Sequence, residues 1–356
     1  MSVFPEDIYT AATSTDWCLC IFFSVDIEGA TAYKVETRNQ KDGDNDWCLL
    51  FESFYVDMPA HFLSEYSEKL ADRLATKGIK EPYRPILWKF VGDEILFYAP
   101  LTDARQSLEH LRAFCQAIKN YNQELKEQNV SVICKGTSWL AGFPINNRII
   151  LIPNYEKLCV SDQNKSIVDF IGSSIDCGFR LTKFSSARKL VISLDLLWMV
   201  AESAKQCPDA TRFEFITSRI RYAGRHELKG VFSGNRYPVF WIDMLSDPSI
   251  EDKWVTSERC CVGDIIKFCE DFSSNVGTSD FIKPFIENDP SGCFCGIPET
   301  FKLQRQLLIN YKEKAAKSNK QETADSTQSA ETANLPTEAR PVKPINDSNQ
   351  HPEQKR

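Results

Sequence analysis

The fold is decided by Phe22-Phe23-Ser24-Val25-Asp26-Ile27-Glu28-Gly29-Ala30-Thr31. The nearly continuous apolar run from Trp17 to Val25 predicts a strand buried on both faces. Asp26 is then expected where this strand ends. The backbone amides that follow it, up to Thr31, are expected to lie at a helix N-terminus, which favours anions such as phosphate.

A second stretch, Lys89-Phe90-Val91-Gly92-Asp93-Glu94, predicts a β-hairpin with Gly-Asp in its turn. Its strands are expected at Pro85 to Phe90 and at Ile95 to Tyr98, which places Asp93 at the loop tip. A single Asp in a turn usually caps the local backbone. Two such carboxylates, each beside a strand, instead favour a divalent metal ion held against a triphosphate, with the Ile27 carbonyl as a further ligand.

Further along the chain, helices and strands alternate, which predicts a ferredoxin-like α+β sandwich. We expect a helix at 102–128 with Thr102 as its N-cap. We expect strands at 131–140 and 189–193, and a second hairpin formed by 227–231 and 237–243.

Composition limits the classes of protein to which the chain can belong. The 356 residues are 42% hydrophobic, which is enough to bury a large core. A net charge of -7 argues against a general nucleic-acid binder. The sequence has no apolar run approaching a membrane span and no signal-like N-terminus, so we expect a cytoplasmic protein that does not enter a membrane. The 13 cysteines fit reduced core thiols.

Four regions follow from these patterns: an N-terminal extension (1–15), a catalytic domain (16–245), an accessory subdomain (246–314) and a tail (315–356). The accessory subdomain has five cysteines but no Cys-x-x-Cys pair, which favours buried thiols over zinc. The tail is polar and has no aromatic residue, so it is expected to be disordered.

Four motifs, in this order, resemble those of class III nucleotidyl (adenylate/guanylate) cyclases. The first two are the carboxylate stretches around Asp26 and Asp93. The third is Asp169-Phe-Ile-Gly-Ser-Ser-Ile-Asp176-Cys-Gly-Phe-Arg180-Leu, and the fourth is Glu227-Leu-Lys229-Gly. The resemblance implies the cyclase catalytic fold and a metal-dependent lyase that turns a nucleoside triphosphate into a 3′,5′-cyclic nucleotide and pyrophosphate.

The resemblance also assigns roles. Asp26, the Ile27 carbonyl and Asp93 would bind two divalent ions, Mn²⁺ or Mg²⁺. The other phosphate ligands would be Glu28, Gly29, Ala30 and Thr31 together with Lys229. Arg180 would stabilise charge at the α-phosphate. Asp176 stands where the family has an asparagine that contacts the ribose. An asparagine side chain both donates and accepts hydrogen bonds, whereas the Asp176 carboxylate only accepts them.

The base-reading positions of the family fall on Lys89 and Asp169. Lys89 supplies a donor and Asp169 an acceptor, and such a pair can complement adenine, cytosine and uracil. Guanine is the least expected base. The longer stretches of sequence around the first and third motifs are similar to those of the pyrimidine cyclases of the Pycsar antiphage system. This implies UTP as substrate, cyclic UMP as product and a separate effector activated by it, with CTP, then ATP, or a non-catalytic nucleotide sensor as alternatives. The family also implies a head-to-tail homodimer with sites at the subunit interface.

Overall fold

The computed structural model describes residues 15–38, 46–152, 167–206, 213, 216–245, 260–276 and 281–331. The chain divides into two compact units at Arg305 and Gln306, and the first contains every predicted site residue. None of the helices in these described residues is long and apolar enough to span a membrane.

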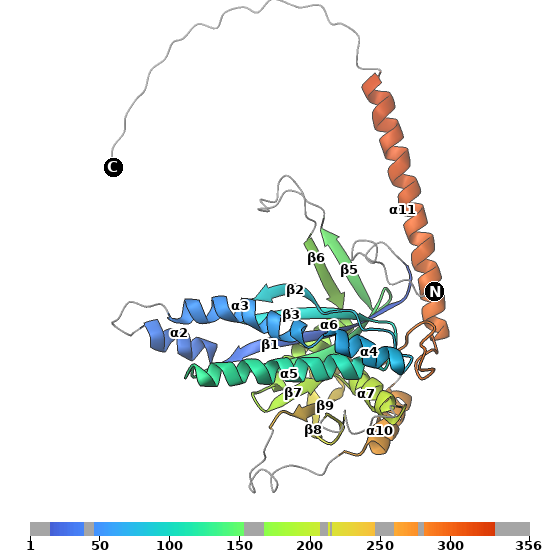
Figure 1. The fold of residues 1–356 in the computed structure, drawn as a ribbon. Helices are drawn as coiled ribbons and strands as arrows, with labels where there is room; N and C mark the ends of the chain where they lie inside the picture. Colours follow the sequence, from blue (N-terminus) through green and yellow to red (C-terminus); the bar gives the residue numbers. More distant parts are fainter. Residues whose placement is uncertain are drawn as a thin grey trace, which may run out of the picture. The chain divides into compact units, whose positions relative to one another are not determined.

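The N-terminal half of the first unit has the ferredoxin-like order (Figure 1). Strand β1 (Cys18–Glu28) is followed by helices α2 (Ala30–Arg38), α3 (Asp46–Ser64) and α4 (Glu68–Thr76), the hairpin β2 (Ile86–Val91) and β3 (Glu94–Leu101), helix α5 (Gln106–Glu127) and strand β4 (Ile133–Phe143). The strands lie in the order β2-β3-β1-β4, and every neighbouring pair is antiparallel. The predicted α+β ferredoxin-like class is therefore confirmed.

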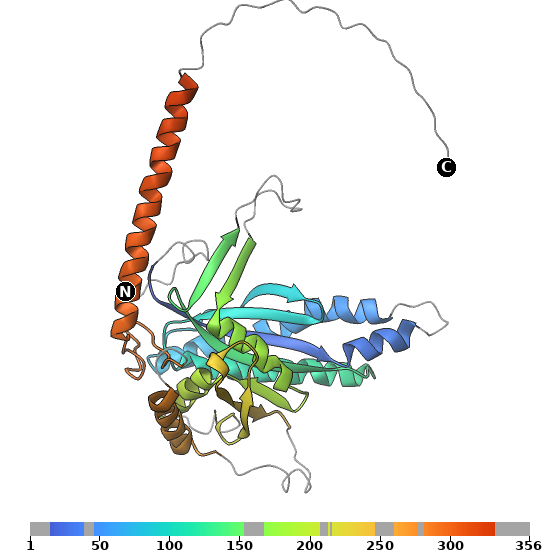
Figure 2. The same ribbon diagram turned by 180° about the vertical axis from the view of Figure 1, so that it is seen from behind.

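The C-terminal half extends the same sheet. A two-stranded arm, β5 (Asn147–Ile152) and β6 (Ile167–Gly172), leads into α6 (Ser173–Leu181) and the short helix η1 (Thr182–Phe184). Strand β7 (Lys189–Ile192) then pairs in parallel with β4. Helix α7 (Leu194–Gln206) and strands β8 (Ile220–Glu227) and β9 (Arg236–Asp243), with η2 (Phe232–Gly234) between them, complete a seven-stranded sheet. Figure 2 shows the arm and α6 from behind.

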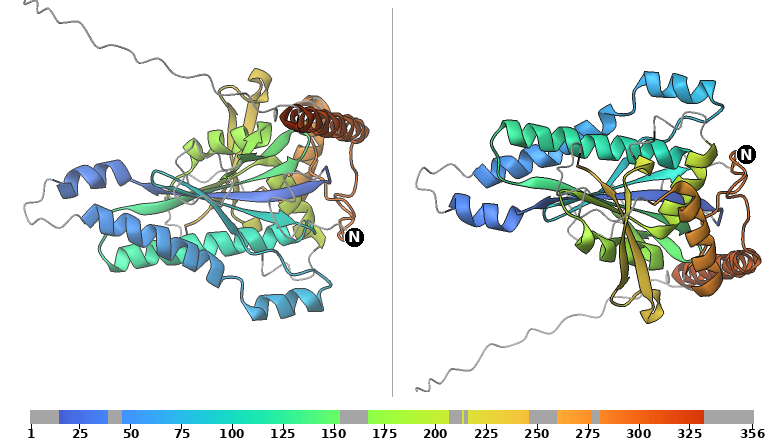
Figure 3. Two further views of the ribbon diagram at one scale, coloured as in Figure 1. Left: turned by 90° about the horizontal axis from the view of Figure 1, so that it is seen from above. Right: turned by 90° about the horizontal axis from the view of Figure 1, so that it is seen from below.

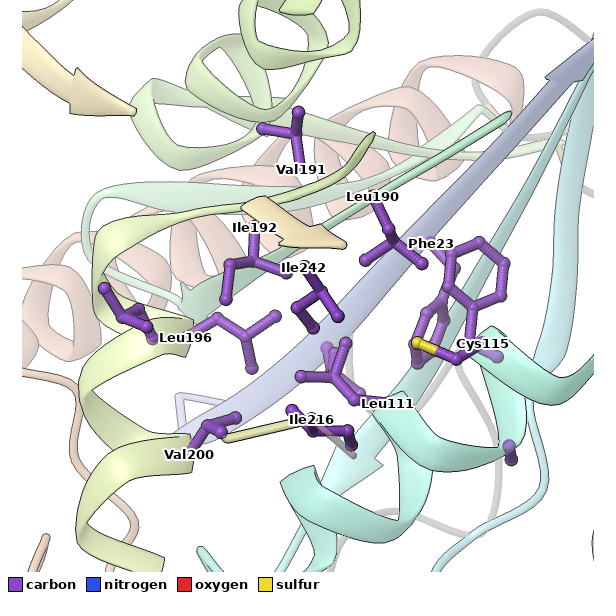
Figure 4. Packing of buried hydrophobic residues seen from close by; sticks show 14 of the residues in the cluster. Phe23, Leu111, Cys115, Leu190, Val191, Ile192, Leu196, Val200, Ile216 and Ile242 are labelled. Atoms are coloured by element: carbon purple, nitrogen blue, oxygen red, sulfur yellow. The ribbon is translucent and has the colours of Figure 1, made fainter. Parts of the chain in front are cut away.

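The two faces of the sheet are covered differently. Helices α3, α5 and α7 pack on one face, and α6 lies on the other, as the two views in Figure 3 show. The first face forms the large core, in which side chains of β1, α5, β7 and α7 interdigitate, among them Phe23, Leu111, Ile192 and Leu196 (Figure 4). The second face has a smaller aromatic cluster under α6 and the arm, formed by Cys20, Phe22, Leu96, Tyr98, Trp139, Ala141, Phe143, Phe170 and Ile175.

Helix α6 can approach the sheet closely because of two glycines. A Cβ on Gly178 would lie 2.2 Å from the ring of Trp139 in β4. Gly172, just before the helix, has φ of 139° and would carry a Cβ 2.4 Å from the carbonyl oxygen of Asn146. Both positions exclude larger residues, so the glycine of the third motif fixes where α6 begins.

Several boundaries differ from the sequence-based predictions. The predicted N-cap Thr102 precedes a turn, and α5 begins only at Gln106, whose side-chain oxygen accepts the Thr102 N–H. The first strand of the second hairpin is β8, which ends at Glu227 rather than beginning there. A positive φ angle at Gly230 breaks the extended conformation that was expected from 227 to 231.

The described part of the C-terminal region contains helices α10 (Val262–Val276) and α11 (Glu299–Glu331). Disorder was predicted from residue 315, but α11 continues to Glu331. Its Ala, Lys, Glu and Gln residues have a high intrinsic preference for a helix. Residues 332–356 of the predicted tail, and 1–14 of the predicted extension, lie outside the described residues.

Candidate active site

A row of charged side chains crosses the second face of the sheet. Asp26 of β1 lies opposite Glu94 of β3 and opposite Lys135 of β4. Directly opposed residues of antiparallel strands point to the same face, so two carboxylates and one ammonium share this surface. Lys135 Nζ lies 3.1 Å from Asp26 Oδ2, and both side chains keep about a quarter of their surface exposed, 21% and 28% respectively.

Asp26 was expected where the first strand ends, but β1 continues through it to Glu28. The strand pairs on both sides as far as Asp26, and pairing with β4 alone carries it two residues further. Burial raises the pKa of Asp26, and the negative charge of Asp93 raises it as well, whereas Lys135 lowers it. The carboxylate is thus partly desolvated and close to a second anion, an arrangement that a cation stabilises.

Asp93 lies in the turn between β2 and β3, as predicted, and the fold brings this turn to Asp26. The Ile27 N–H donates to the Asp93 carbonyl at 3.4 Å. From the other side, the hydroxyl of Tyr55 in α3 donates to the Gly92 carbonyl. The Tyr55 ring also packs on Phe90, with ring centroids 4.7 Å apart. The turn is therefore held both by β1 and by α3.

Glu94 and Lys135 are site residues that the sequence analysis did not select. The Ser24 hydroxyl donates to Glu94 Oε1 at 2.5 Å. Burial raises the pKa of Glu94, and the charges of Asp26 and Asp93 add to the rise. Glu94 could have been noticed because it follows Asp93 directly. Lys135 has no local signal, since only the register of β1 with β4 places it beside Asp26.

The predicted phosphate loop follows β1 directly. Gly29 has φ of 88°, and α2 begins at Ala30, so the amides of Ala30 and Thr31 are in the first turn of a helix. Glu28 is directed elsewhere, because its Oε2 accepts the Ala187 N–H at 2.7 Å. The loop thus offers helix amides, while the Glu28 side chain joins it to the connection between η1 and β7.

Lys89 and Asp169, the predicted base-reading pair, are joined directly. Lys89 Nζ lies 2.7 Å from Asp169 Oδ1, and the side chains are 36% and 38% exposed. Across the sheet, Lys89 is in register with Leu96 of β3 and Ser24 of β1. Ser24 and Asp26 are two residues apart, so Lys89 is displaced from Asp26 by about 7 Å along the strands and lies on the same face. A β-bulge beside it turns Trp88 toward Phe22 and Phe170, and the Lys89 ammonium lies 4.2 Å from the centre of the Trp88 ring.

Asp176 and Arg180 lie on α6, and Lys229 lies in the connection that follows β8. Asp176 is exposed in the first turn of the helix, and Arg180, one turn later, is exposed in the last. Arg180 Nε donates to the Lys229 carbonyl at 3.1 Å. The structure therefore joins Arg180 to Lys229 and joins Asp26 to Asp93, but no contact within one chain joins the first pair to the second among the described residues.

The donor set near Asp26 is suited to Mg²⁺ or Mn²⁺ in a nucleotide complex. It offers two carboxylates and a backbone carbonyl, and such ions commonly take only one or two protein carboxylates and complete their shell with phosphate and water oxygens. Within the described residues, no three His, Cys, Asp or Glu side chains are grouped so that they could hold a metal ion by themselves. The phosphates of a substrate would thus be needed to complete the site.

No family model and no curated protein matches the chain. Similar solved structures include the adenylyl cyclase CyaB from P. aeruginosa, at 13% identity and a TM-score of 0.42, covering 66% of this chain and 97% of that one. The guanylyl cyclase Cya2 has 15% identity and a TM-score of 0.37, covering 64% and 92%. The Adenylate/Guanylate Cyclase/Hydrolase from Silicibacter pomeroyi has 13% identity and a TM-score of 0.37, covering 64% and 98%.

Proposed function

We propose that the protein is a class III nucleotidyl cyclase. The observation that carries the proposal is the meeting of Asp26 and Asp93, which are far apart in sequence, beside the N-terminus of α2. The partly desolvated carboxylate of Asp26 and the nearby carboxylate of Asp93 repel each other when alone, and they form a favourable site beside the first amides of α2 once divalent cations and phosphates are present. The four motifs that resemble the cyclases support the same reaction.

Each residue then has a task in the cyclisation. Asp26, the Ile27 carbonyl and Asp93 would hold the metal ions, which would polarise the ribose 3′-hydroxyl and neutralise the pyrophosphate. The amides of Ala30 and Thr31 orient the phosphates. Arg180 stabilises the charge that develops at the α-phosphate.

Three further residues complete the site: Lys89 and Asp169 position the base, and Lys229 binds the terminal phosphates. The acceptor-only carboxylate of Asp176 receives a ribose hydroxyl. We further propose that the protein acts in the cytoplasm as a homodimer, with each site made by both subunits.

We propose UTP as the substrate and cyclic UMP as a messenger in antiphage defence that activates a separate effector. The Lys89–Asp169 pair supports a base with adjacent acceptor and donor groups, so CTP and ATP stay as alternatives, and guanine is the least favoured base. The choice of UTP depends on the likeness of the motifs to the Pycsar pyrimidine cyclases.

The deciding experiment is incubation of the purified protein with Mn²⁺ and each of the four nucleoside triphosphates, with products identified by mass. We expect cyclic UMP as the main product. Cyclic CMP or cyclic AMP would correct the substrate and keep the reaction. Saturable nucleotide binding without any cyclic product would instead assign the chain as a nucleotide sensor.

Replacing Tyr55 by phenylalanine should weaken metal binding while the fold is kept. The variant loses only the hydroxyl that holds the Gly92 carbonyl and keeps the ring on Phe90, so Asp93 becomes less fixed. We expect the Mn²⁺ concentration for half-maximal activity to rise about fivefold, with the loss of one hydrogen bond costing about 1 kcal/mol. Tyr311→Phe, at an exposed tyrosine of α11, is the matched control. An unchanged Mn²⁺ dependence would show that α3 does not position the turn.

A further inference from the structure

A cationic cluster lies where α6 and η1 meet the connection after β8. Besides Arg180 and Lys229, it contains Lys183 of η1, which the motifs do not include. The Lys183 ammonium donates to the Glu227 carbonyl at 3.4 Å, and the Arg180 guanidinium donates to the Lys229 carbonyl at 3.1 Å. All three side chains are exposed. Arg180 and Lys183, on two successive turns of the α6–η1 segment, therefore both donate to backbone carbonyls within residues 227–229.

The nearest acidic residues along the chain are Asp176, one helical turn before Arg180, and Glu227, two residues before Lys229. Among the described residues, none of the three cations has a carboxylate oxygen within ion-pair distance, in contrast to Lys89, Lys135 and Arg188, which each have a carboxylate partner. Arg180 and Lys183 instead donate to backbone carbonyls, which carry no net charge. Three uncompensated positive charges favour the binding of a multiply charged anion.

The same segment is also joined to the phosphate loop of its own chain. Directly after η1, the Ala187 N–H binds the Glu28 carboxylate at 2.7 Å, and Glu28 precedes the helix amides of α2. This contact fixes, within one chain, the position of the backbone that carries Lys183. Its ammonium is also held toward the β8 end from which Lys229 extends.

We propose that Lys183 is a third phosphate-binding cation of the active site, which acts with Lys229 on the terminal phosphates of the nucleoside triphosphate. The proposal deepens the proposed function and rests on it for the identity of the ligand. On binding, the Lys183 ammonium exchanges its Glu227 carbonyl partner for a phosphate oxygen, a stronger, charge-assisted hydrogen bond. It contacts the leaving pyrophosphate part and not the base, so its contribution is the same for every nucleotide.

The test compares Lys183→Gln, Lys183→Arg and a control, Lys126→Gln, which changes an exposed lysine in the last turn of α5. Binding of inorganic tripolyphosphate is measured by calorimetry, and KM and kcat are measured with the substrate. We expect Lys183→Gln to weaken tripolyphosphate binding about tenfold and to raise KM similarly with little change in kcat, as for the loss of one charge-assisted hydrogen bond. Lys183→Arg should restore most of both, and Lys126→Gln should change neither.

A purely structural role for Lys183 would give a different result. If the residue only ties η1 to β8, Lys183→Gln will lower the melting temperature and leave tripolyphosphate affinity at the wild-type value, which overturns the proposal. Because tripolyphosphate binding needs no turnover, it also separates this inference from the proposed reaction. A wild-type protein that binds tripolyphosphate through Lys183 but forms no cyclic product keeps the phosphate site and refutes the cyclase.

Discussion

Asp26→Ala and Asp93→Ala should each abolish cyclic nucleotide formation, with at least a thousandfold loss of kcat. Each variant removes one of the two carboxylates proposed to hold the metal ions, and positioning and charge neutralisation by such ions would supply most of the catalysis expected for this reaction. Product is measured by mass spectrometry at saturating nucleotide. Mn²⁺ binding, followed by electron paramagnetic resonance in the presence of nucleotide, should fall in both variants.

Both variants should stay folded, for different structural reasons. Asp93 lies in a turn, and its contacts with Ile27 involve its backbone, which the substitution keeps. Asp26 lies inside β1, but its partner Lys135 is 21% exposed, so the unpaired ammonium can reach water, and the loss of this ion pair costs about 1 kcal/mol or less. Asp72→Ala, at an exposed position of α4, controls for the loss of one negative charge. Wild-type turnover in either site variant would refute the proposed metal site.

Mixing Asp93→Ala with Arg180→Ala should restore about a quarter of the wild-type activity. If each site takes its metal carboxylates from one subunit and its arginine from the other, a mixed dimer has one doubly damaged site and one intact site. Random exchange of equal amounts makes about half of the dimers mixed, with one working site of two in each. The structure is compatible with such sharing, because within one chain Arg180 contacts Lys229 and not the Asp26 region.

The complementation has two controls. Subunit exchange is verified with differently tagged variants, and a mixture of Asp26→Ala with Asp93→Ala should show no recovery, because both substitutions damage the same half of the site. Activity that stays at the level of the single variants, after exchange is verified, means that the site lies within one chain or that Arg180 does not act at the α-phosphate.

The local elements with strong patterns could be predicted well. The hairpin with Asp93 in its turn and the buried strand before Asp26 are both found, because period-two or continuous apolar runs and turn residues act within a few residues. Boundaries were less accurate: β1 extends beyond Asp26, and α5 begins at Gln106 and not at Thr102. These ends depend on pairing and side-chain contacts with other segments, which a local pattern does not contain.

The sequence by itself determined the α+β ferredoxin-like class and the candidate carboxylates Asp26 and Asp93, because the alternation of apolar runs and the turn chemistry are local properties. Lys89 and Asp169 became candidates through the resemblance of their motifs to the cyclases. Only the tertiary structure decided which of these side chains meet. Strand register places Lys135 and Glu94 beside Asp26, and helix α3 brings Tyr55 to the Asp93 turn. The packing of η1 on β8 adds Lys183 to the cations. These contacts form between residues far apart in the chain, so their positions are fixed by the pairing and packing of the whole sheet and not by any neighbouring residues.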